Sequence, residues 1–234
     1  MIQKKVPIIV ALDFPEFDQA YSLATQLDPA QCRIKVGKEL FTRSGPQAIE
    51  QLQKLGFEIF LDLKFHDIPN TVAGACRAAA DLGCWMINVH ASGGKAMLEA
   101  ASNAVQQATE QPLLIAVTVL TSLDDQALGE IGYANDSEST TQRLASLARD
   151  AGLDGVVSSA HDIEKTKRAQ GKDFLVVTPG IRPAGSEVGD QARIATPQNA
   201  LERGADYLVI GRPITQAKNP LDALGAIIAE IDSD

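Results

Sequence analysis

The sequence predicts an α/β protein that folds as a single (β/α)8 TIM barrel. The chain has 234 residues, a length that suits one barrel of about 200 to 250 residues. Eight short apolar segments alternate with helical ones, and strict alternation of this kind is typical of a parallel sheet. No linker or low-complexity tract divides the chain. We therefore expect one barrel domain over residues 1–234.

The expected strands are mostly rich in Val, Ile and Leu, as is usual for parallel strands that helices cover. They are Val6–Asp13, Cys32–Gly37, Phe57–Lys64, Cys84–Ala91, Leu113–Leu120, Gly155–Ser158, Phe174–Gly180 and Tyr207–Gly211. An open doubly wound sheet is the alternative for such a pattern. No GxGxxG motif follows the first strand, and this favours the barrel.

Helix signals stand between these strands. Thr196-Pro197 and Asn219-Pro220 each offer a capping side chain followed by a proline suited to the first helical turn. Elsewhere, apolar residues recur at helical spacing and a glycine follows them, as in the segment that ends before Gly83. These signals predict helices in the places that a barrel requires.

Two long loops are expected on the side of the barrel where the strands end. They cover Thr121–Asp136, after the fifth strand, and Ile181–Ala195, after the seventh. A TIM barrel builds its active site on this side. Long loops in such places often close over a substrate, so we expect these two to act as lids.

Composition limits the classes of partner. The formal net charge is −9, and an acidic surface repels the phosphates of nucleic acids. No apolar run approaches the ~18–20 residues that span a bilayer, and the apolar part of the N-terminus is too short for a signal peptide. The three cysteines, Cys32, Cys76 and Cys84, form no CxxC pair. We expect a cytoplasmic protein with reduced, buried thiols and no disulfide or zinc site.

Charged residues stand at the ends of the first three expected strands. Alternate residues of a strand share a face, so Asp62 and Lys64 of FEIFLDLK point together into the mouth of the barrel. The same alternation turns Lys35 inward on the neighbouring strand. Asp13 ends the first strand, and Asp67 follows three residues after Lys64. We expect these five ionisable groups to converge.

Burial of charged groups costs several kcal/mol per ion unless the groups pair. Alternating signs make the burial tolerable, and carboxylates beside a lysine favour its charged form. A purely structural ion-pair network is the alternative interpretation for any one of these residues. Their position at the catalytic end of the barrel favours a functional site.

The last two strands are followed by glycine and arginine. Gly180 and Arg182 follow the seventh strand, and Gly211 and Arg212 follow the eighth. In TIM barrels these two loops frequently bind phosphate, and arginine suits bidentate contact with phosphate oxygens. The sequence therefore predicts a ligand that carries a phosphate.

Taken together, these motifs resemble those of the bacterial orotidine 5′-phosphate decarboxylases. The resemblance rests first on DLKFHDIPNTV at positions 62–72, which contains that family's DxKxxD signature. It extends over essentially the whole chain through VALDFP, IKVGKELF, NVHASGG, VTVLTS, TPGIRP and VIGRPI. The resemblance implies a carboxy-lyase of pyrimidine biosynthesis that converts orotidine 5′-monophosphate to UMP and CO₂, the last step of de novo UMP synthesis, without a metal or another cofactor.

The resemblance also assigns roles to individual residues. Lys35, Asp62, Lys64 and Asp67 would form the catalytic network, with Lys64 as the proton donor. Asp13 would hold the ribose hydroxyls with help from Lys35, and Thr121, or less favourably Ser122, would meet the amide edge of the pyrimidine. The enzyme would be a homodimer in which the partner subunit supplies Asp67 and Thr71. The phosphate would be held by Arg182, Gln191, Gly211 and Arg212.

Two other functions remain open. A magnesium-dependent sugar-phosphate decarboxylase or aldolase on the same scaffold would keep the DxKxxD pattern, but such enzymes typically carry a carboxylate where Lys35 stands. A non-catalytic nucleotide-binding barrel would bind UMP without turnover, yet it would gain nothing from a buried charge network. For the three histidines, His66, His90 and His161, no carboxylate or cysteine at ligand spacing completes a ligand set, so we expect no metal site.

Overall fold

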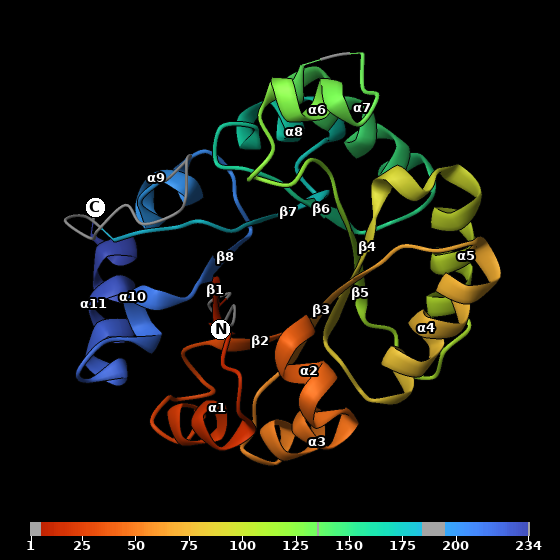
Figure 1. Ribbon diagram of the computed structural model, residues 1–234. Helices are drawn as coiled ribbons and strands as arrows, with labels where there is room; N and C mark the ends of the chain where they lie inside the picture. The colour runs from red at the N-terminus through yellow and green to blue at the C-terminus, as the bar shows by residue number, and fades with distance from the viewer. Residues whose placement is uncertain (1–5, 135, 184–194, 234) are drawn as a thin grey trace.

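The computed structural model describes residues 6–134, 136–183 and 195–233. All eight expected strands form, and they close into a parallel barrel in chain order (Figure 1). The strands are β1 (Ile8–Leu12), β2 (Arg33–Gly37), β3 (Ile59–Phe65), β4 (Met86–His90), β5 (Leu113–Val117), β6 (Gly155–Val157), β7 (Leu175–Thr178) and β8 (Tyr207–Ile210). The last strand pairs with the first, which confirms the predicted barrel and excludes the open sheet.

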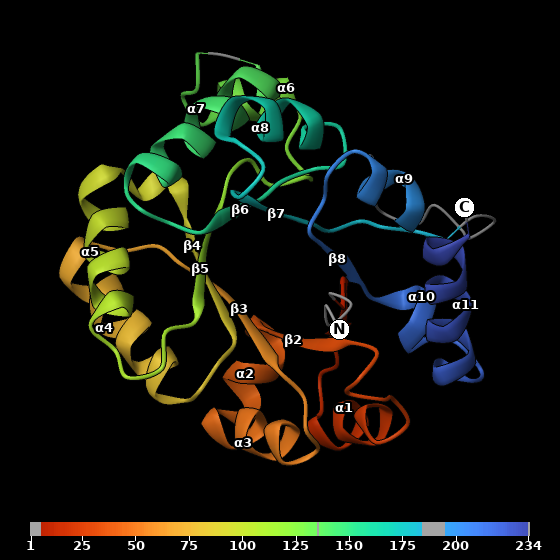
Figure 2. The same ribbon diagram turned by 180° about the vertical axis from the view of Figure 1, so that it is seen from behind.

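Helices surround the barrel on all sides, as the view from behind also shows (Figure 2). They are α1 (Phe17–Ala24), α2 (Lys38–Ser44), α3 (Pro46–Lys54), α4 (Pro69–Asp81), α5 (Lys95–Gln106), α6 (Asp125–Glu130), α7 (Ser137–Asp150), α8 (Ile163–Gln170), α9 (Pro197–Glu202), α10 (Arg212–Thr215) and α11 (Pro220–Asp232), with a short 3₁₀ turn at Ala91–Gly93. Within the described residues, no helix is both long and apolar enough to cross a membrane.

Two predicted helix starts are confirmed. The side chain of Thr196 accepts a hydrogen bond from the Asn199 backbone N–H at the start of α9. The side chain of Asn219 accepts one from the Asp222 backbone N–H at the start of α11. In both helices a proline occupies the first turn, where its missing N–H leaves no helical hydrogen bond unmade.

The expectation of an uninterrupted loop over Thr121–Asp136 is wrong, because α6 lies within it. The Asp124 side chain accepts a hydrogen bond from the Ala127 backbone N–H at 2.8 Å and so caps this helix. In the other expected lid, residues 184–194 lie outside the described part of the chain. Its two ends, Ile181 and Ala195, are joined by a parallel β-bridge.

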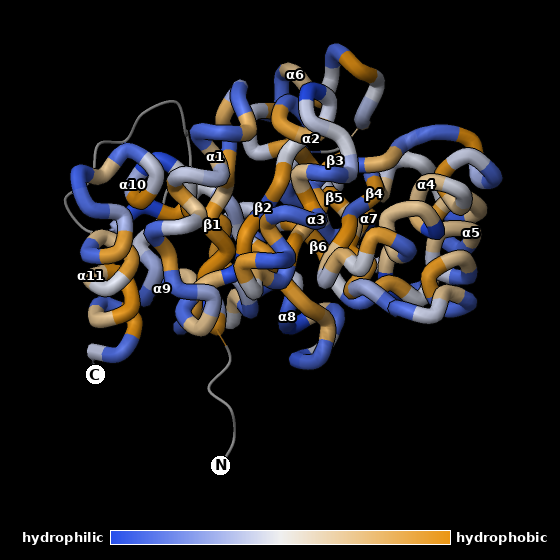
Figure 3. The backbone as a smooth tube through the Cα atoms, turned by 90° about the horizontal axis from the view of Figure 1, so that it is seen from below, coloured by the Kyte–Doolittle hydropathy of each residue, from blue (hydrophilic) through white to orange (hydrophobic). Residues whose placement is uncertain are grey.

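The strands have two apolar faces. The outward face packs against the helices, and the inward face fills the barrel with Ile9, Phe60, Met86, Ile115 and Val177, all at most 1% exposed. In the side view the strands contain much of the most hydrophobic colouring (Figure 3). Because side chains fill its interior, the barrel is a packed core and not a pore. This packed layer supports a site at the ends of the strands.

The three cysteines are buried and free. Burial raises the pKa of each thiol to about 12. Since the thiolate is the reactive form, none of the three is a nucleophile near neutral pH. This agrees with the prediction of reduced, buried thiols.

Candidate active site

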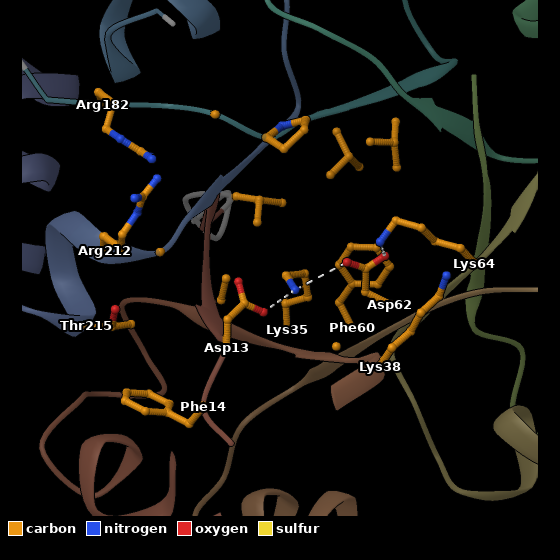
Figure 4. Close-up of a pocket in the computed structure, with 18 of the residues that line it drawn as sticks. Asp13, Phe14, Lys35, Lys38, Phe60, Asp62, Lys64, Arg182, Arg212 and Thr215 are labelled. Carbon is orange, nitrogen blue, oxygen red and sulfur yellow. Dashed lines mark hydrogen bonds and ion pairs between the residues drawn. The ribbon is translucent and has the colours of Figure 1, made fainter. Parts of the chain in front are cut away.

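A cavity of about 680 Å³ lies where the strands end. Figure 4 shows charged side chains from several strands directed into it. Among the described residues, its lining consists of Ala11, Asp13, Phe14, Lys35, Gly37, Lys38, Phe60, Asp62, Lys64, Val157, Val177, Pro179, Gly180, Arg182, Val209, Gly211, Arg212, Thr215 and Gln216. Its volume is in the range of sites for small ligands, about 300–1,000 Å³.

Four of the five predicted ionisable groups form a chain of alternating charge. Lys35 Nζ lies 2.9 Å from Asp13 Oδ1 and 3.3 Å from Asp62 Oδ2. Lys64 Nζ lies 2.6 Å from Asp62 Oδ1. Lys35 and Asp62 are only 7% and 8% exposed. The order of charges is therefore minus, plus, minus, plus across the mouth of the barrel.

Neighbouring parallel strands bring these four residues together. In the ladder between β1 and β2, Lys35 is opposite Ala11, and in the ladder between β2 and β3, Asp62 is opposite Gly37. Gly37 also leaves room for the network. A Cβ atom there would lie 3.3 Å from both Asp13 Oδ1 and Lys35 Nζ, which is tighter than most contacts with a side chain.

Lys64 has an unusual backbone conformation. Its φ is +53°, and among the described residues it alone has a positive φ without being glycine. Non-glycine residues in this region cost of order 1–3 kcal/mol and tend to occur at functional sites. The strand is irregular here, because its register with β4 shifts between Leu61 and Phe65. The alternation predicted that the Lys64 side chain points inward, but it did not predict this conformation.

The network fixes the protonation of its buried members. Burial by itself would lower the pKa of Lys35, but the carboxylates of Asp62 and Asp13 outweigh burial and raise that pKa above its usual value. Burial would raise the pKa of Asp62, but Lys35 and Lys64 outweigh it and lower that pKa. Both residues are therefore charged at neutral pH.

The cavity has an excess of positive charge. Among the described residues, five cationic side chains and two carboxylates line it, a formal net charge of +3, although the whole chain carries −9. Arg182 and Arg212 lie on one side of the cavity, and Lys64 lies on the other (Figure 4). The other two cations are Lys35 and Lys38. Lys38 was not predicted as a site residue, although its position directly after β2 in IKVGKELF was a visible signal.

Among the other predicted residues, Asp67, Thr71 and Thr121 do not line this cavity. Four of the five groups expected to converge meet within one chain; Asp67, expected three residues past the end of the third strand and from the partner subunit, does not join them in the described chain. The chain turns outward after β3, and Asp67 and Thr71 are exposed on the way into and at the start of α4. Thr121 is half-buried in the loop after β5, and Gln191 lies outside the described residues.

Two histidines stand beside the network. The rings of His66 and His90 are 5.4 Å apart between centroids. Burial and the nearby His66, Lys38 and Lys64 lower the pKa of His90 to about 4, so His90 is neutral at neutral pH. In the described part of the chain, no group of three or more His, Cys, Asp or Glu side chains is placed to hold a metal ion.

Comparison with known proteins decides the family. The family model described as "Orotidine 5'-phosphate decarboxylase / HUMPS family" matches residues 6–227. The chain belongs to this family. Its members include proteins closely similar in sequence to this chain, so the resemblance inferred from DLKFHDIPNTV and the other motifs is confirmed.

Similarity extends over nearly the full length of its relatives. The chain is 57% identical over 225 residues to the orotidine 5′-phosphate decarboxylase of Alcanivorax borkumensis, covering 96% of this chain and 97% of that protein. It is 60% identical over 225 residues to that of Dichelobacter nodosus, covering 96% and 98%. The crystal structure of the Lactobacillus acidophilus enzyme has a TM-score of 0.88 and 40% identity, with 97% of this chain and 99% of that chain covered.

Proposed function

We infer that the chain catalyses the decarboxylation of orotidine 5′-monophosphate to UMP and CO₂, the last step of de novo UMP synthesis. Besides membership of the family, one structural observation supports this conclusion. The alternating chain of Asp13, Lys35, Asp62 and Lys64 crosses a cavity whose other side holds Arg182 and Arg212. The cavity thus combines a charged reaction centre with a cationic end suited to phosphate.

The charge of the cavity matches the substrate. A phosphate monoester carries about −1.5 to −2 at pH 7, and the carboxylate on the pyrimidine adds a further negative charge. The described part of the cavity lining, with a formal charge of +3, balances this anion. The phosphate would bind at Arg182, Gly211 and Arg212, where guanidinium groups and the N–H groups of the loop can contact its oxygens.

The reaction requires stabilisation of a carbanion. When the bond between C6 and the carboxylate breaks, CO₂ leaves and the electron pair stays on C6 in the plane of the ring. The π-system cannot take up a pair in that plane. The available routes are electrostatic stabilisation of the developing charge and rapid protonation of C6.

Lys64 can contribute to both routes. Its ammonium would lie near C6, stabilise the developing negative charge and then donate a proton to the carbon, becoming a neutral amine that regains a proton from solvent. Its side chain is 26% exposed, which gives solvent that access. Asp62 Oδ1, at 2.6 Å from Lys64 Nζ, would hold the ammonium in position.

The rest of the substrate would be bound away from C6. Asp13 would accept hydrogen bonds from the ribose hydroxyls, with Lys35 beside it, and Thr121 would meet the amide edge of the pyrimidine. Gln191 would add a contact to the phosphate. Binding energy from the distant phosphate would help to position the base for reaction.

We also propose that the enzyme is a cytoplasmic homodimer with shared active sites. Asp67 and Thr71 are exposed next to the mouth of the barrel, and Ile68 between them is 67% exposed. A single exposed apolar side chain is common on protein surfaces, so the proposal rests on the family resemblance and on the exposure of Asp67 and Thr71. The partner subunit would supply Asp67 and Thr71 to complete the network around Lys64. The three free, buried thiols are typical of a reducing compartment.

A turnover assay tests the function and separates it from its rivals. Lys35, an ammonium held between two carboxylates, stands where a metal-dependent relative would need a carboxylate ligand. We therefore expect orotidine 5′-monophosphate to be decarboxylated at the same rate with and without EDTA, as followed by absorbance. Activity that EDTA removes and Mg²⁺ restores would identify the metal-dependent class. UMP binding without any turnover would identify a non-catalytic barrel.

Replacement of Arg212 tests the phosphate end. Arg212→Ala should lower kcat/KM for orotidine 5′-monophosphate by about 100-fold or more, because a charge-assisted contact is worth roughly 3 kcal/mol. Turnover of the phosphate-free nucleoside orotidine, already slow, should scarcely change. Arg168→Ala, on the exposed face of α8, is the matched control and should affect neither substrate. Equal losses for both substrates would show that Arg212 has another role.

Subunit exchange tests the shared site. In an isologous dimer, equal amounts of the inactive variants Lys64→Ala and Asp67→Ala would exchange into mixed dimers in which one site carries both changes and one carries neither. Roughly a quarter of all sites should then recover activity. Lys64→Ala mixed with Asp62→Ala is the control and should recover none, because those two residues meet within one chain. No recovery in the first mixture, once mass spectrometry shows exchange, would refute the shared site.

A further inference from the structure

Asn88 lies opposite the irregular part of β3 and is completely buried. In the ladder between β3 and β4, Leu61 pairs with Ile87 and Phe65 pairs with Val89. Three residues of β3, from Asp62 to Lys64, are therefore opposite Asn88 alone. The regular exchange of backbone hydrogen bonds cannot continue across such a bulge, so polar groups of β3 need other partners here.

The side-chain amide of Asn88 provides two of these partners. Its Oδ1 accepts a hydrogen bond from the Lys64 backbone N–H at 2.8 Å. Its Nδ2 donates one to Asp62 Oδ1 at 2.6 Å, the same oxygen that Lys64 Nζ contacts at 2.6 Å. The orientation of the amide is fixed by chemistry, because an N–H requires an acceptor and an ionised carboxylate requires a donor.

Asn88 therefore closes a ring of contacts with the two residues of the reaction centre. It holds Lys64 by its backbone, at the position where φ is +53°, and it holds Asp62 by its carboxylate. The Lys64 side chain returns to the same carboxylate. A neutral, buried amide that both donates and accepts is required at this place. Aspartate can only accept when it is ionised, and an apolar side chain can do neither.

We propose that Asn88 is a positioning residue for the decarboxylation, whose side-chain amide fixes the backbone of Lys64 and the carboxylate of Asp62 so that the Lys64 ammonium is aimed at the reacting carbon. Asn88 does not line the cavity and so acts through these two residues. The proposal rests on the proposed function. Small displacements of a catalytic group of this kind can lower a rate by about 100-fold.

Two substitutions separate the two hydrogen bonds. Asn88→Asp keeps the shape and the acceptor for the Lys64 N–H but replaces the donor to Asp62 with a carboxylate. Asn88→Leu removes both hydrogen bonds. The same changes at Asn103, exposed on α5, are matched controls and should leave kcat unchanged. Thermal melting identifies folded variants. Asn88→Asp, which has nearly the same shape as the native residue, carries the test if Asn88→Leu does not fold.

Three measurements distinguish a positioning role from a structural one. We expect kcat for orotidine 5′-monophosphate to fall by about 100-fold in both Asn88 variants. The Kd of UMP should stay within about threefold, because the phosphate and ribose contacts lie elsewhere. In hydrogen exchange followed by NMR, the Lys64 backbone amide should stay protected in Asn88→Asp and lose protection in Asn88→Leu.

The pH dependence gives an independent readout. In the described chain Lys35 and Lys64 contact Asp62, and Asp13 lies beside Lys35. His66 and Lys38 lie near His90, which itself is close to Asp62; all remain in both variants. Asn88→Asp also adds a carboxylate beside Asp62, so Asn88→Leu isolates the loss of the donor. Asn88 donates a hydrogen bond to the ionised form of Asp62, so loss of that donor raises the pKa of Asp62. The acidic limb of the kcat profile should therefore move to higher pH.

The outcomes separate this proposal from the proposed function. A kcat within threefold of the unaltered enzyme would overturn the role of Asn88 while the assignment as a decarboxylase stands. Equal losses of kcat and of UMP binding, or an unmoved acidic limb, would reduce Asn88 to a structural residue. Absence of turnover in the unaltered enzyme would instead refute the proposed function.

Discussion

The buried ion pair between Lys35 and Asp62 is the interaction on which the site depends. Both side chains are almost excluded from solvent, and removal of one partner from such a pair typically costs about 3–5 kcal/mol. Each charge also needs a second partner, which Asp13 provides for Lys35 and Lys64 provides for Asp62. The two buried charges thus hold Asp13 and Lys64 in place by ion pairs, and Lys64 lies at the end of the network, where the substrate would bind.

The barrel makes this arrangement possible. Adjacent parallel strands place Asp13, Lys35 and Asp62 at neighbouring points of one rim, and glycine at position 37 leaves room between them. A regular β3 would complete its ladder with β4. The bulge instead frees the Lys64 backbone, and Asn88 binds it. The fold therefore supplies both the rigid support and the one irregularity that the reaction centre uses.

Much of the molecule could be predicted from the sequence. The barrel followed from eight apolar segments, and the inward directions of Lys35, Asp62 and Lys64 followed from strand alternation. The short helix α6 was missed, because a helix of six residues is too short to show a clear apolar periodicity. Asn88 was missed for another reason. A polar residue inside MINVH was visible as a signal, but its partners depend on a bulge in a different strand, which alternation cannot reveal. The position of Asp67, three residues past the end of the third expected strand, predicted that the chain has left the barrel interior there, and Asp67 is exposed.

The most direct test of the account is the separation of binding from chemistry at Lys64. In Lys64→Ala, turnover of orotidine 5′-monophosphate should fall to the background rate, because no other described ammonium contacts Asp62 Oδ1. Calorimetry should still show UMP binding close to that of the unaltered enzyme, since Arg182, Arg212 and Asp13 are intact. Substantial turnover in a folded Lys64→Ala variant that binds UMP normally would contradict the central role of this lysine.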